Sequence, residues 1–184
     1  MCINSNEVTR YEVLNEFANK NAVVVLGSTF MHDVPVSELK QSFKIHSDIY
    51  NRSLTDMKVS EAKDVISTIM ENMTPKKIVL QLGEVELQDE DVNITEVFSE
   101  MRNLMDLIRS HNKHCKIVLV SVVSDNAKVS EYNNMLEKLA NTYKCQFADI
   151  VSGSKKSESA YVNAFMKLKY FISDDIADAL ALTL

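Results

Sequence analysis

Short runs of aliphatic residues alternate along this chain with longer stretches in which apolar residues recur every three or four positions. Three of the runs are almost continuously apolar, and they cover residues 22–26, 78–82 and 117–123; residues 145–150 are a fourth candidate strand. Strands buried on both faces have this composition, which is typical of a parallel sheet covered by helices. The run that begins at Ile45 is interrupted by His46 and Asp48, so we predict a strand there at the edge of the sheet.

The longer stretches have the period of amphipathic helices. Apolar residues recur at helical spacing over residues 59–73, 94–108 and 132–143, and a leading helix is predicted over residues 8–17. Asn93 and Glu96 form a capping-box-like start for the second of these helices. Ser173, with the acids at 174 and 175, would begin a last helix that runs to the C-terminus. The alternation of strands and helices predicts an α/β domain with three layers, α/β/α.

Length and charge narrow the class of protein. A chain of 184 residues with 46% hydrophobic and 25% charged residues is long and apolar enough for one domain over residues 1–184, with residues 1–20 as a helix packed on it. The net charge of −6 makes nucleic acids and anionic membranes poor partners. Without an apolar leader or a run long enough to cross a bilayer, we expect a cytoplasmic protein. The partner, a small molecule or another protein, and the oligomeric state stay open.

The cysteines indicate neither a disulfide framework nor a zinc site. There are three of them, Cys2, Cys115 and Cys145, which is an odd number, and they are widely separated with no Cys-x-x-Cys pair. We therefore expect reduced structural thiols, no metal and no cofactor.

Glycine is scarce, so the positions of Gly27 and Gly83 are informative. Each follows directly after a predicted buried strand, where a parallel sheet presents its binding loops. If the strand order is 2-1-3-4-5, these two loops flank the point at which the order reverses. The crevice at that point is the expected ligand site.

The loops at these strand ends resemble the sequence blocks of SGNH (GDSL-type) hydrolases. Residues 23–29, Val-Val-Val-Leu-Gly-Ser-Thr, resemble the first block, in which Gly-Asp-Ser or Gly-Ser-Ser ends with the nucleophile. Thr29 takes that position. Residues 49–56 resemble the second block, and Asp56 stands where the family has a glycine whose N–H helps form the oxyanion hole. Residues 78–87 resemble the third block, Gly-x-Asn-Asp.

The resemblance covers nearly the whole chain from about residue 21. It implies a flavodoxin-like, five-stranded parallel sheet in the order 2-1-3-4-5 and the ester-cleaving chemistry of the family. Val85 and Glu86 replace the Asn-Asp pair of the third block, whose Asn is an oxyanion donor. The family's last block, Asp-x-x-His, corresponds by position to residues 168–171, Leu-Lys-Tyr-Phe. On this alignment both the catalytic base and its orienting acid are absent.

An acyl-transfer site needs a nucleophile, a base and donors for the developing oxyanion, and this sequence offers only the first. Thr29 carries a β-methyl group that crowds attack, and we expect it to cap the helix after the first strand. Losing the Asn donor at Val85 would cost roughly a hundredfold to a thousandfold in rate. The carboxylates of Asp56 and Glu86 would repel an oxyanion. The first hypothesis is therefore a catalytically degenerate domain that keeps a polar crevice for binding or interaction.

Eight residues line the expected crevice, namely Gly27, Ser28, Asn51, Arg52, Asp56, Gly83, Glu84 and Glu86. The competing hypothesis is an active esterase in which Thr29 is the nucleophile and His32 the base. A third is a hydrolase that uses Asp56 and Glu86 as acid and base.

Other polar residues have simpler interpretations. Asp33 and the crevice acids could converge, but their spacing matches no known metal signature. Arg52 could hold an anionic ligand bidentately, but we expect it to form an internal ion pair with these acids. His46 falls in the predicted edge strand, and His111 and His114 fall at the opposite end of the sheet, so we assign them no function.

Overall fold

Five parallel strands form one sheet in the order β2-β1-β3-β4-β5, which confirms the predicted order. The strands are β1 (Val23–Gly27), β2 (Ile49–Asn51), β3 (Lys77–Gln81), β4 (Lys116–Val120) and β5 (Gln146–Ala148). This computed structural model describes residues 5–151 and 160–172 of the chain. β2 lies at the edge as predicted, but its pairing with β1 begins only at Ile49, opposite Val23. His46 therefore lies outside the strand in which we had placed it.

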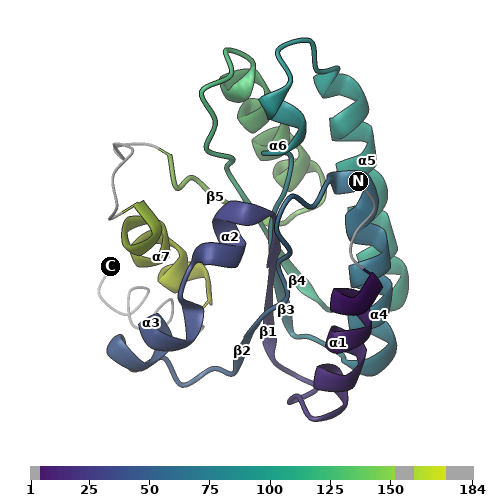
Figure 1. The fold of residues 1–184 in the computed structure, drawn as a ribbon, viewed down its shortest axis with the longest axis vertical. Helices are drawn as coiled ribbons and strands as arrows, with labels where there is room; N and C mark the ends of the chain where they lie inside the picture. The colour runs from purple at the N-terminus through teal and green to yellow at the C-terminus, as the bar shows by residue number, and fades with distance from the viewer. Residues whose placement is uncertain (1–4, 152–159, 173–184) are drawn as a thin grey trace.

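Helices cover both faces of the sheet and complete the predicted α/β/α layers. They are α1 (Ser5–Glu16), α2 (Thr29–Asp33), α3 (Val36–Ser42), α4 (Ala62–Asn72), α5 (Ile94–His111), α6 (Val129–Thr142) and α7 (Ala160–Ile172), with short 3-10 turns η1 (Val59–Glu61) and η2 (Glu86–Gln88). Figure 1 shows α1, α4 and α5 on one side of the sheet and α2, α3 and α7 on the other. Among the described residues, no helix combines the length and apolarity that crossing a bilayer requires.

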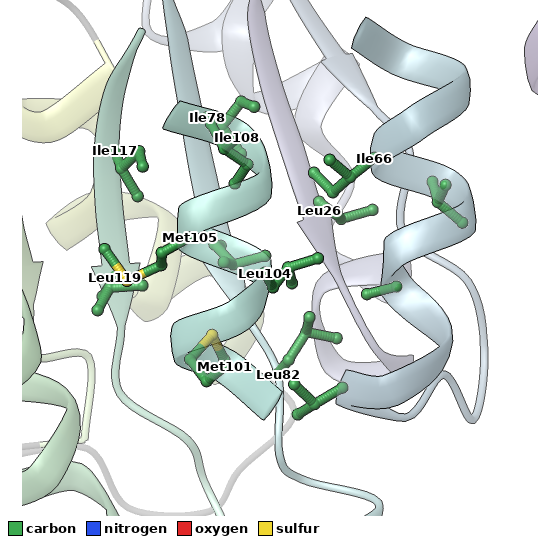
Figure 2. Packing of buried hydrophobic residues seen from close by; sticks show 14 of the residues in the cluster. Leu26, Ile66, Ile78, Leu82, Met101, Leu104, Met105, Ile108, Ile117 and Leu119 are labelled. Atoms are coloured by element: carbon green, nitrogen blue, oxygen red, sulfur yellow. The ribbon is translucent and has the colours of Figure 1, made fainter. Parts of the chain in front are cut away.

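The larger core lies between the sheet and the layer of α4, α5 and α6. Side chains of α5 at helical spacing face the strands, and they include Met101, Leu104, Met105 and Ile108. Figure 2 shows them beside Leu26, Ile78, Leu82, Ile117 and Leu119. Each fully buried Leu, Ile or Met side chain contributes about 1.5 to 3 kcal/mol. The amphipathic pattern that predicted α5 therefore also accounts for its position against the sheet.

A helix after the first strand was expected only through the cap predicted at Thr29, and that helix is α2; α3 and α7 were not predicted. α2 and α3 have five and seven residues, too few for a helical period to be recognised. α7 is longer, and its buried residues Ala164, Phe165, Leu168 and Ile172 do share one helical face. The end of this stretch corresponds by position to the family's last block, which precedes the last helix, and we predicted no helix over it. The helix predicted to start at Ser173 lies outside the described residues.

Candidate functional site

The carboxyl ends of β1 and β3 lie side by side at the point where the strand order reverses. Gly27 ends β1 and is paired with Gln81, the last residue of β3. A Cβ atom at Gly27 would lie 2.6 Å from the Cβ of Met31 and 2.7 Å from the carbonyl oxygen of Gln81. Only glycine therefore allows α2 to turn so closely over the neighbouring strand. We use "crevice" for the loops that follow β1, β2 and β3 at this edge.

Thr29 is the first residue of α2, and Asp56 contacts its hydroxyl twice. The backbone N–H of Asp56 donates to Thr29 Oγ1 at 2.9 Å, and that hydroxyl donates to Asp56 Oδ1 at 3.3 Å. Asp56 has a φ of 54°, the left-handed conformation that favours glycine. This backbone fits the resemblance, which placed a family glycine at the position of Asp56.

Thr29 does not cap α2, so that prediction was wrong. The N-cap residue is Ser28, whose side chain makes no cap hydrogen bond. The Ser28 hydroxyl is fully buried and has no hydrogen-bond partner. The hydroxyl of Thr29 has its partner across the crevice because the loop after β2 brings Asp56 to it, which local sequence cannot reveal.

Glu84 places a second carboxylate beside Thr29 and Asp56. Both of its carboxylate oxygens accept from the backbone N–H of Phe30, at 3.2 and 3.3 Å. Burial raises the pKa of Glu84, and the charges of Asp33 and Asp56 raise it further, while the Phe30 N–H opposes the shift. Of the four acids that could converge, Asp33, Asp56 and Glu84 are thus near enough for the charges of the first two to act on the third.

Glu86 does not join them. Its Oε1 accepts from the backbone N–H of Val59 at 2.7 Å, and its other carboxylate oxygen is buried without a partner. Burial raises the pKa of this carboxyl as well, with Glu100 adding to the shift. The pairing with Val59 holds the Glu86 side chain, which comes from η2, against the start of η1 and apart from the Thr29 hydroxyl that Asp56 contacts. Within residues 5–151 and 160–172, no three His, Cys, Asp or Glu side chains are arranged to hold a metal ion.

Asn51 and Arg52 use their polar groups inside the fold. The amide of Asn51 donates to the carbonyl of Met31 at 2.8 Å, which ties the end of β2 to α2. Arg52 is buried, donates from Nε to Asn15 Oδ1 at 2.9 Å, and lies 5.2 Å from the ring centroids of Tyr11 and Tyr50. The predicted ion pair is wrong, because α1 supplies an amide and an aromatic ring where we expected a carboxylate.

No histidine in the described part of the chain bonds to the Thr29 hydroxyl. His32 Nδ1 lies 3.0 Å from Asp33 Oδ1, and its side chain is 45% exposed. His111 ends α5, and His114 lies in the loop before β4, at the opposite edge as predicted. The esterase hypothesis therefore has no imidazole partner in place for Thr29.

The segment that we aligned with the last family block is misplaced. Residues 168–171 lie in the last turn of α7, and the carbonyl of Phe171 accepts from Lys77 at the start of β3. That is the amino-terminal edge of the sheet, away from Thr29. The residues that precede α7 are 152–159, outside the described part of the chain, and the sequence contains no histidine after His114.

Sequence reasoning missed several features near the crevice. Tyr161 of α7 packs against Phe30 with ring centroids 5.1 Å apart and the two ring planes tilted by 34°. A cavity of about 420 Å³ lies beside Glu84, and Glu90 and Asp125 also line it. Gln81 is fully buried and neither amide atom has a partner. Its place at the end of an aliphatic strand was the one signal available beforehand.

No family model matches the sequence, and no curated protein matches it. Solved structures do match the fold. A provisionally assigned platelet activating factor from Streptococcus pneumonia is 18% identical, with a TM-score of 0.78 over 91% of this chain and 92% of its own. A provisionally assigned acylhydrolase from Bacteroides fragilis is 14% identical, with a TM-score of 0.76 over 91% and 96% of the two chains.

A GDSL-like lipase from Bacteroides thetaiotaomicron is also 14% identical, with a TM-score of 0.75 over 90% of this chain and 96% of its own. The likeness extends over nearly the full length of all three structures. The chain therefore has the α/β/α fold of SGNH/GDSL hydrolases, as the strand-end loops had indicated. At these identities the likeness establishes the fold, and activity has to be argued from the side chains of the crevice.

Proposed function

We propose that this domain, built on the SGNH-hydrolase fold, is a binding module whose crevice does not hydrolyse esters. The observation that carries the proposal is the pairing around Thr29. Its hydroxyl is bonded to the backbone and the carboxylate of Asp56, and the next backbone N–H, that of Phe30, is bonded to Glu84. The groups that an acyl-transfer enzyme leaves free for its substrate are thus engaged with each other.

The nucleophile position has an unsuitable environment for losing a proton. A hydroxyl becomes an effective nucleophile when a base takes its proton and later delivers it to the leaving group. Around Thr29 the described side chains offer carboxylates, and an alkoxide formed there would face the negative charges of Asp56 and Glu84. The ionised hydroxyl would therefore be destabilised.

Two donors of the family's oxyanion hole are also replaced or engaged. Val85 stands where the family has its Asn donor, and the loss of one such donor costs roughly a hundredfold to a thousandfold in rate. The N–H of Asp56 is occupied by Thr29 Oγ1. A tetrahedral intermediate would develop its negative charge next to carboxylates, which disfavours the transition state.

The same crevice is suited to a ligand that brings hydrogen-bond donors or positive charge. Burial and neighbouring acids raise the pKa of Glu84, which means that its ionised form is destabilised. A cation bound beside the carboxylate would reduce that destabilisation. The adjoining cavity of about 420 Å³ is large enough for a small molecule, and no Lys, Arg or His is among the described residues that line it.

Binding can be tested with a matched pair of probes. Arginine and citrulline differ in one group, a cationic guanidinium against a neutral ureido group. We expect millimolar arginine to raise the melting temperature of the wild-type protein more than citrulline does, because a ligand of the native state stabilises it. In Glu84→Gln the advantage of arginine should fall. Equal shifts for the two probes, or an unchanged advantage in the variant, would contradict a cation-favouring crevice.

One observation favours a second candidate, an esterase with an unusual base. Asp56 Oδ1 lies 3.3 Å from Thr29 Oγ1, within reach of its proton. Turnover of p-nitrophenyl acetate and butyrate by the purified full chain separates the two functions. The binding-module proposal predicts non-saturable release that is equal in wild type, Thr29→Ala and the control Thr55→Ala, a nearby exposed threonine. Saturable turnover that is lost only in Thr29→Ala would establish the esterase.

A further inference from the structure

A basic cavity lies at the amino-terminal edge of the sheet, on the far side from the crevice. Its volume is about 490 Å³, and it lies between the loop that precedes β4 and the loop that precedes β5. Arg109, His114 and Lys144 are among its lining residues, and no Asp or Glu is among the described ones. In a chain with a net charge of −6, this concentration of positive charge is a local feature.

Arg109 is held rigidly within this basic cavity. Its Nη1 donates to the backbone carbonyls of Lys113 at 3.1 Å and Cys115 at 2.8 Å, and its Nη2 lies 3.4 Å from Cys145 Sγ. Within the described residues its guanidinium forms no ion pair with a carboxylate. A half-buried guanidinium that is fixed in place and keeps unused N–H groups is preorganised to bind an anion.

Helix ends account for part of this charge. α5 ends at His111 and α6 at Thr142, so both present carbonyl groups to this edge. Basic residues near a helix C-terminus offset its partial negative charge. That effect explains a cation at each helix end, but it does not require cations from two connections to line one cavity.

We propose that the basic cavity binds a small phosphate-bearing molecule through Arg109 and Lys144. The guanidinium fork matches two phosphate oxygens, and the lysine supplies a second positive charge from the opposite connection. A volume of about 490 Å³ lies within the range of small-molecule sites. This site is separate from the crevice and does not depend on the function proposed for it.

Cys145 provides a reporter inside the cavity, because its half-buried thiol lines the cavity wall next to Arg109. Iodoacetate and iodoacetamide alkylate thiols through the same displacement and differ mainly in charge. The ratio of their rates at Cys145, measured by mass spectrometry and compared with free cysteine, reports the local preference for anions. We expect the ratio in wild type to exceed that of free cysteine by about threefold or more.

Three variants identify the source of that preference. Arg109→Gln and Lys144→Gln should each lower the ratio toward that of free cysteine, whereas Arg102→Gln, which removes the same charge from α5 outside the cavity, should leave it unchanged. Lys144 is exposed, so its variant reports on the cavity even if Arg109→Gln fails to fold. A ratio equal to that of free cysteine in wild type, or equal losses in the control, would overturn the proposal.

Direct binding is measured with inorganic pyrophosphate as the probe. Pyrophosphate should slow alkylation of Cys145 by the neutral reagent iodoacetamide and should release measurable heat on titration, and both effects should weaken in Lys144→Gln. Absence of both protection and heat in wild type would refute the phosphate site. Equal protection by chloride at the same ionic strength would reduce it to general screening and would equally refute it.

Discussion

Gly83→Ala tests whether the loop after β3 is fixed by close packing against α6. Gly83 has a φ of 110°, which side chains rarely adopt, and a Cβ atom there would lie 2.5 Å from Cε1 and 2.7 Å from Cζ of Tyr132. Tyr132 is fully buried and donates its hydroxyl to the carbonyl of Leu82 at 3.2 Å. The added methyl group must therefore strain the backbone and also displace the ring.

Backbone strain and displacement of the Tyr132 ring together set the loss of stability expected in Gly83→Ala. Backbone strain of this kind costs about 1 to 3 kcal/mol. A displaced ring gives up its hydrogen bond and leaves a buried polar group unsatisfied, for another 1 to 3 kcal/mol, roughly. We expect Gly83→Ala to lower the free energy of unfolding by about 2 to 6 kcal/mol, and the melting temperature by roughly 4 to 24 °C for a chain of this size. Urea denaturation measures the first quantity.

A double-mutant cycle separates the contributions. In a Tyr132→Leu background the ring is gone, so Gly83→Ala should cost only the backbone strain of about 1 to 3 kcal/mol. The reasoning would be refuted if Gly83→Ala cost less than about 1 kcal/mol in the wild-type background, since that lies below the strain alone. Equal costs in the two backgrounds would exclude the contact with Tyr132 as a cause.

Two further predictions concern charged groups. Because the folded state raises the pKa of Glu84, it binds that proton more tightly than the unfolded chain does, and stability falls as pH rises through the raised value. Glu84→Gln keeps an acceptor for the Phe30 N–H and does not titrate. In urea denaturation its free energy of unfolding should exceed that of the wild type at pH 7, and the difference should vanish near pH 4. A difference that does not change with pH would show that charge is not its cause. Arg52→Lys keeps the charge but loses the planar guanidinium between two tyrosine rings and the hydrogen bond to Asn15. Its free energy of unfolding, measured by urea denaturation, should be about 1 to 3 kcal/mol lower than that of the wild type. An unchanged midpoint would count against these contacts.

The sequence by itself determined the layers and the edge at which the polar loops gather, and the resemblance to SGNH hydrolases supplied the strand order. Continuous aliphatic runs identify strands buried on both faces, and helical spacing identifies the faces of α4, α5 and α6, because both patterns follow from backbone geometry. The cap predicted at Asn93 is present, with its side chain accepting from the N–H of Glu96. The loop glycines at 27 and 83 lie at the strand ends because the chain must turn closely there.

Only the tertiary structure decided the partners of the polar side chains. Asp56 meets Thr29, Glu84 meets the N–H of Phe30, and Glu86 goes instead to Val59, all pairings between segments far apart in the chain. Arg52 contacts aromatic rings and an amide because α1 packs where we expected acids. A polar group is satisfied by whatever distant segment the fold brings within about 3 Å of it, and one-dimensional spacing carries no record of that distance.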